Sequence, residues 1–132
     1  MSPLDALYPK VRDLVVRLGR GARDDAARDA LLSEIARAQA ELCVPFARLC
    51  SARGARFDRG PEGWPALPTD VFRHARVACF PEADEARAFL TSSTTSGARG
   101  RHALPELGLY DLAARRRRAR ALHRPGAARA AD

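Results

Sequence analysis

Apolar side chains recur at helical spacing over the first half of the chain, and this pattern constrains the fold more than any other feature. Over residues 2–18 leucine and valine return every three or four positions, which predicts one helix with an apolar stripe. Ser2 can cap its start, Pro3 suits the first helical position, and Gly19 can end it. Pro9 lies inside the pattern, where it either kinks the helix or delays its start.

A second, longer helical pattern covers residues 24–51. Its apolar face holds Leu31, Ile35, Ala38, Leu42, Phe46 and Leu49, and its other face is charged. Pro45 lies inside this pattern and should kink the helix or divide it in two. Two amphipathic helices joined by a short glycine-containing turn predict a helical hairpin that needs another layer to pack on.

Glycine and proline dominate residues 52–69, which predicts a loop. Because Phe57, Trp64 and Leu67 are costly to leave exposed, we expect these side chains to anchor the loop to the rest of the protein.

The pattern then changes to short elements. The apolar run at 76–80 predicts a β-strand, a polar turn follows at 82–86, and a second apolar run at 87–90 leads into a Ser/Thr/Gly segment. Residues 107–122 predict a final helix, and residues 123–132 lose apolar periodicity, so we expect a disordered tail. The length of 132 residues fits one domain of ordinary size.

The formal net charge of +7 raises the question of a nucleic-acid partner. Residues 113–132 hold seven arginines and one aspartate, a net of +6, whereas the other 112 residues hold 16 basic and 15 acidic side chains, a net of +1. Nearly all basic residues are arginine and alanine is abundant, which a GC-rich genome would produce without selection for binding. The body of the chain is therefore close to neutral, and charge alone does not favour nucleic acid as the partner.

The spacing of the cysteines and histidines does not predict a disulfide or metal site. Cys43, Cys50 and Cys79 lack CxxC spacing, and the three histidines do not cluster with other metal ligands, so we expect neither a disulfide framework nor a metal site. The start of the chain lacks the pattern of a signal peptide, and no apolar stretch approaches the roughly 18 residues of a membrane span. We therefore expect a cytoplasmic protein.

Residues 91–102, TSSTTSGARGRH, have the composition of an anion-binding loop. Six consecutive hydroxyl residues offer hydrogen-bond donors, and the glycines allow the backbone to curl around an anion. Arg99 and Arg101 supply charge in a form that suits phosphate. From composition alone, a flexible surface loop is an equally good interpretation, and neither a Walker A nor a GxGxxG motif is present.

The order of these residues is similar to the (S/T)(S/T)GTTGxP(K/R)G loop of adenylate-forming enzymes, which include acyl- and aryl-CoA ligases. It more closely resembles the branch with TSGTTSG followed by a basic residue and a histidine. That branch is the acyl-protein synthetase family, the ligase component of the bacterial bioluminescence fatty-acid reductase complex. Residues 67–72, LPTDVF, and 109–111, LYD, resemble the segments that flank the family's loop. The resemblance extends over residues 1–122.

The resemblance implies an α/β fold: a helical hairpin, short strands, a Ser/Thr/Gly phosphate loop and a helix, forming the N-terminal part of an adenylate-forming domain. It also implies a reaction in which ATP activates a carboxylic acid, such as a fatty acid, as an acyl-adenylate that passes to a thiol or a protein. The residues matched to ATP binding are Thr91, Ser92, Ser93, Thr94, Thr95, Ser96, Gly97, Arg99, Gly100, Arg101 and His102. Mg²⁺ would share the phosphate charge. No catalytic residue is assigned.

Two departures from the family pattern matter. Ser93 stands where the family has glycine, and a left-handed backbone would strain a serine there by about 1–2 kcal/mol. Family members are also much longer, so we expect this chain alone to be inactive and a partner chain to be able to supply the remainder. Two other hypotheses stay open: a small basic nucleic-acid-binding or scaffolding protein that uses the arginine-rich end, and a remnant without activity.

Overall fold

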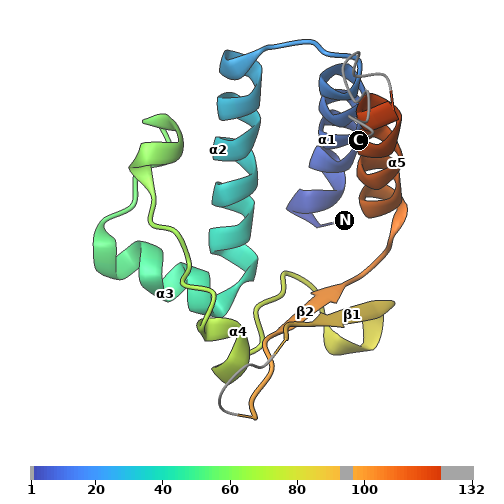
Figure 1. Cartoon of the computed structure of the whole chain (residues 1–132). Helices are drawn as coiled ribbons and strands as arrows, with labels where there is room; N and C mark the ends of the chain where they lie inside the picture. The colour runs from blue at the N-terminus through green and yellow to red at the C-terminus, as the bar shows by residue number, and fades with distance from the viewer. Residues whose placement is uncertain (1, 93–96, 123–132) are drawn as a thin grey trace, which may run out of the picture.

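A computed structural model describes residues 2–92 and 97–122 of the chain (Figure 1). The helices are α1 (Pro3–Gly19), α2 (Asp25–Leu42), α3 (Val44–Arg53), the short α4 (Val71–His74) and α5 (Gly108–Leu122). Two 3-10 turns, η1 (Gly60–Gly63) and η2 (Glu82–Asp84), and two strands, β1 (Arg87–Leu90) and β2 (Arg101–Leu104), complete the described elements. The described part of the chain is therefore rich in helix with one small antiparallel sheet, which confirms a mixed α and β composition.

The predicted first helix is confirmed, and two reciprocal hydrogen bonds cap its N-terminus. The Leu4 N–H donates to Ser2 Oγ at 3.3 Å, and the Ser2 N–H donates to the Asp5 carboxylate at 2.7 Å. These bonds satisfy amide groups that a helix start otherwise leaves without partners. Because α1 already begins at Pro3 and continues past Pro9, that proline does not delay the helix.

The second helical pattern is divided, as Pro45 predicts. The chain leaves helical geometry at Cys43, with φ −106° and ψ 103°, and Pro45 then occupies the first turn of α3. Proline is tolerated in a first turn because its missing N–H would have no partner there. As a result α3 leads away from the C-terminal end of α2 in a different direction (Figure 1).

Two apolar clusters hold the helices together. Leu7, Leu31 and Ala38 form the first cluster, between α1 and α2. The second, here called the α2–α3 cluster, consists of Ala36, Cys43, Phe46 and Cys50. Phe57, Trp64 and Leu67 pack against the α2–α3 cluster, which confirms that the glycine- and proline-rich segment is anchored.

The strand predicted at 76–80 is wrong. This segment has no strand partner among the described residues, and Val77 and Cys79 pack instead against the α2–α3 cluster. Arg76 Nη2 donates to the Phe80 carbonyl at 3.0 Å. A β-prone run forms a strand only where a neighbour completes its hydrogen bonds, so the apolar pattern here reflects core packing.

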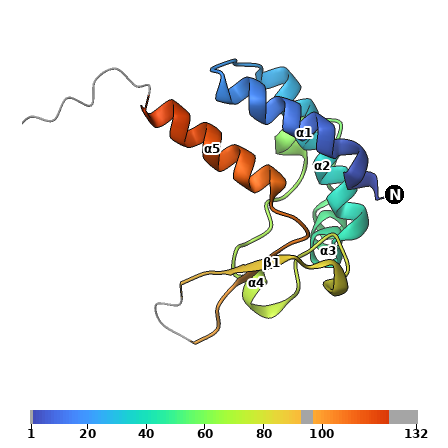
Figure 2. The same ribbon diagram turned by 90° about the vertical axis from the view of Figure 1, so that its right-hand side faces the viewer.

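The sheet is a hairpin of β1 and β2, and β2 is not predicted from the sequence. Arg87 pairs with Leu104 at one end, and Leu90 pairs with Arg101 at the other. The hairpin lies beyond the N-terminal end of α1 and the C-terminal end of α2, next to α4, while α5 lies beside α1 (Figures 1 and 2). None of the described helices is long and apolar enough to cross a membrane. The predicted tail at 123–132 lies outside the described residues.

Candidate functional site

The Ser/Thr/Gly segment connects the two strands of the hairpin, and one residue pair closes its base. The Thr91 N–H donates to the Gly100 carbonyl at 2.9 Å, and the Gly100 N–H donates to Thr91 Oγ1, also at 2.9 Å. Gly100 is buried, and an added Cβ would lie 3.1 Å from Thr91 Oγ1 and 3.4 Å from Phe72 Cβ. The close approach of Thr91 therefore favours glycine at position 100, because an added methyl would need the threonine hydroxyl to shift slightly.

The described part of the loop also includes a left-handed residue. Gly97 has φ +70°, a conformation that favours glycine whatever space surrounds it. Ser92 is exposed beside the closed base. Four of the residues matched to ATP binding, Ser93, Thr94, Thr95 and Ser96, lie outside the described residues.

Arg99 faces a group of basic side chains. It lines a hollow of about 410 Å³ between α4, the segment that follows it, and β2. The charged and titratable side chains of this hollow, here called the basic hollow, are Arg73, His74, Arg76, Glu82, Arg99 and Arg101. Arg99 is exposed and forms no ion pair with any residue in the described ranges. Its guanidinium is therefore available to an anion.

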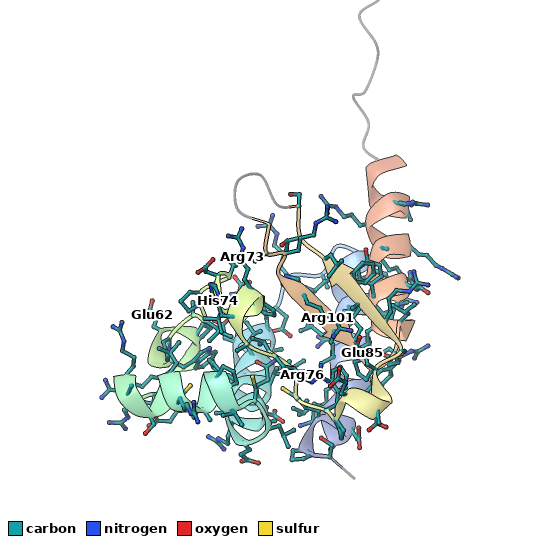
Figure 3. All side chains as sticks on the ribbon, turned by 90° about the horizontal axis from the view of Figure 1, so that it is seen from below. Glu62, Arg73, His74, Arg76, Glu85 and Arg101 are labelled. Carbon is teal, nitrogen blue, oxygen red and sulfur yellow. The ribbon has the colours of Figure 1, made fainter. Side chains whose placement is uncertain are left out.

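Arg101, in contrast, already has an acidic partner. Both of its terminal nitrogens donate to the Glu85 carboxylate, the Nη1–Oε2 distance being 2.7 Å. Arg76 Nη1 donates to the same carboxylate at 3.3 Å. Figure 3 shows these three side chains together, with Arg73 and His74 on α4 to one side. Hydrogen bonds from Arg101 lower the pKa of Glu85, so this carboxylate is charged at neutral pH.

Aromatic stacking fastens the hairpin on two sides. The His102 ring stacks on Phe72 with centroids 4.2 Å apart, which joins β2 to α4. Phe89 stacks on Tyr110 at 5.3 Å, which joins β1 to α5. His102, which the sequence places in the loop, is therefore a half-buried residue of β2 with an aromatic partner.

The sequence does not identify Phe72, Arg76 or Glu85 as neighbours of the hairpin loop. Phe72 lies in the LPTDVF segment, which marks it only by resemblance. Arg76 and Glu85 carry no local signal, because their partners come together only through the fold.

The described side chains bear on two further kinds of chemistry, metal binding and nucleophilic attack by Cys79. No group of three or more His, Cys, Asp and Glu residues in residues 2–92 and 97–122 is arranged to hold a metal ion. Burial raises the pKa of the Cys79 thiol to about 11, with a smaller effect from neighbouring Cys43. A thiol with so high a pKa is a poor nucleophile at neutral pH, because the thiolate is the reactive form.

No family model, curated protein or solved structure matches this chain. The hairpin loop combines three features that suit anion binding. Its base is closed by Thr91 and Gly100, Gly97 is left-handed, and the Arg99 guanidinium is exposed.

Proposed function

We propose that this chain carries the ATP-phosphate loop of an acyl-protein synthetase-like ligase. Such a ligase activates a carboxylic acid with ATP and transfers the acyl group to a thiol or a protein. The observation that carries the proposal is the closed base of the loop, where Thr91 and Gly100 hold each other through two hydrogen bonds. A closed base brings the two ends of a polar segment together, so that donors near both ends can reach one anion.

The donor set of the loop fits a polyphosphate. Hydroxyls at Ser92 and its neighbours supply neutral donors, and Arg99 supplies a charged one. Mg²⁺ would enter with ATP and be held mainly by phosphate oxygens, as this ion commonly is. The role assigned to the loop is to bind the β- and γ-phosphates and to stabilise the charge that develops on pyrophosphate.

Calorimetric titration with ATP and Mg²⁺ tests this function. We expect binding by the unmodified chain and a weaker affinity for Arg99→Gln. Loss of one charged hydrogen-bond donor costs about 1.5–3 kcal/mol, or roughly 10- to 100-fold in Kd. Ser92→Ala should weaken binding by a smaller factor, because it removes a neutral donor.

Arg87→Gln is the matched control, because Arg87 is an exposed arginine of β1 that does not line the basic hollow. It should leave ATP affinity unchanged. Absence of ATP binding, or equal losses in Arg87→Gln and Arg99→Gln, would contradict the proposal.

Nucleic-acid binding through α5 is the second candidate. Arg115, Arg117 and Arg118 are exposed on this helix and form no ion pair within the described residues. A mobility shift of generic DNA that declines steeply with salt, is lost in Arg117→Gln/Arg118→Gln and persists in Ser92→Ala would favour it. The ligase proposal is preferred because it uses the closed loop, whereas α5 offers charge alone.

A further inference from the structure

Two arginines that line the basic hollow, Arg76 and Arg101, share a carboxylate, Glu85, that is not itself one of the lining residues. Glu85 accepts hydrogen bonds from both Arg76 and Arg101, and its side chain is only 11% exposed. The side chain of Arg76 is 32% exposed and that of Arg101 is 46% exposed, so solvent reaches both. A guanidinium has five N–H donors, and Arg101 directs two of them to Glu85.

The charge around the basic hollow is closely balanced. Four arginines line it and Glu82 is the acid among its lining residues, a net of +3. The partners Asp70 and Glu85 reduce this to +1, because Asp70 pairs with Arg73 and His74 at 3.4 and 3.3 Å. Removing the charge of Glu85 alone would raise the net to +2.

A carboxylate and a phosphate present similar paired oxygens to a guanidinium. Glu85 and a phosphate in the basic hollow would therefore compete for the guanidinium N–H donors of Arg76 and Arg101. Arg99 belongs both to the described end of the hairpin loop and to the basic hollow, so an anion bound by Arg99 would lie next to Arg76 and Arg101.

We propose that Glu85 is an internal competitor that limits phosphate binding at the loop by holding Arg101 and Arg76. This inference rests on the proposed function, since it concerns the regulation of the same site. Arg101, which the sequence matches to the loop, donates its hydrogen bonds to Glu85. The Arg99 guanidinium has no such acidic partner among the described residues and can bind an anion. The ligand class is a phosphate-bearing anion, and inorganic pyrophosphate is the probe.

The experiment is a double-variant cycle with Kd for pyrophosphate as the readout. Glu85→Gln removes the charge and keeps the shape of the side chain, and it should tighten pyrophosphate binding about tenfold. Arg101→Gln alone should weaken binding much less than Arg99→Gln, because Glu85 already occupies Arg101. In the Arg101→Gln background, Glu85→Gln should lose most of its effect.

Glu82→Gln is the matched control, because Glu82 lines the same hollow but makes no hydrogen bond to an arginine in the described part of the chain. It should change the affinity far less than Glu85→Gln. Equal gains in the two variants would show a general charge effect and would overturn the inference. If Glu85→Gln fails to fold, the Arg101→Gln result decides, since a large loss of affinity would mean that Glu85 does not withhold Arg101.

The outcomes separate this inference from the proposed function. If pyrophosphate binds the unmodified chain but Glu85→Gln does not tighten it, the inference fails and the phosphate loop stands. If only Glu85→Gln binds, the unmodified loop is not a phosphate site, and the proposed function fails together with the inference that rests on it. If no variant binds, both fail.

Discussion

At the level of single residues, two hydrogen bonds between Thr91 and Gly100 fix the geometry of the loop base. The threonine hydroxyl accepts from the glycine amide, and the glycine carbonyl accepts from the threonine amide. Position 100 has little room for a side chain, because an added Cβ would lie 3.1 Å from Thr91 Oγ1. This contact gives a steric reason for glycine at position 100.

Gly100→Ala should destabilise the protein. The added methyl would force Thr91 or Phe72 to move, and overpacking of this kind costs about 1–3 kcal/mol. Urea unfolding followed by circular dichroism measures the change. Ala98→Ser, at an exposed neighbouring position, is the control and should have almost no effect. Equal stability of Gly100→Ala and the unmodified protein would contradict the close packing described above.

Cys79 should react slowly with iodoacetamide in the folded protein. With a pKa of about 11 against an ordinary value of 9.0, its thiolate fraction at neutral to mildly basic pH is lower by roughly 100-fold. Unfolding in urea should restore the ordinary rate, and mass spectrometry of the peptide that contains Cys79 measures both rates. Rapid labelling without urea would show that the thiol is not desolvated.

The same shift has a consequence for stability. The unfolded chain releases this proton near pH 9.0, whereas the folded protein retains it to about pH 11. The stability associated with Cys79 is therefore fully present below pH 9 and is lost as the pH rises toward 11.

At the level of elements, the long helices and the run at 87–90 that forms β1 are predictable from this sequence, whereas the strand predicted at 76–80 is wrong and β2 is not predicted. The spacing of leucine and valine in α1, the cap at Ser2 and the break at Pro45 are local signals that the structure confirms. Strand formation depends on a partner. Residues 76–80 have β-prone side chains but no partner in the described part of the chain, whereas β2 is short and is defined by its pairing with β1.

The anchoring of the glycine- and proline-rich segment can be tested at Trp64. This side chain is half-buried against the α2–α3 cluster, and its ring lies 5.9 Å from that of Phe57. Trp64→Ala should therefore cost roughly 2 kcal/mol, less than a fully buried tryptophan would. Thermal unfolding measures the loss.

Leu32→Ala is the control for Trp64→Ala, because Leu32 is an apolar side chain that is 39% exposed. Its effect on stability should be much smaller. If the two variants lose the same stability, Trp64 is not an anchor.

At the level of the whole molecule, the helices support the hairpin and leave the described ends of its loop accessible. Stacking of His102 on Phe72 and of Phe89 on Tyr110 joins the strands to α4 and α5. The start of the loop and its left-handed glycine at position 97 could be predicted from the sequence. The end of the loop could not, because Arg101 and His102, which the sequence places in the loop, belong to β2. The pairing of Arg101 with Glu85 could not, because the two residues are 16 positions apart and meet only when the hairpin forms.

We propose that the hairpin loop binds the phosphates of ATP. The most direct test is to titrate ATP and Mg²⁺ into isotope-labelled protein and to follow every backbone amide by NMR. We expect the largest chemical-shift changes in residues 91–101 and little change in residues 113–122 of α5. Absence of shifts, or shifts confined to α5, would contradict the claim and would favour the arginine-rich helix as the functional surface.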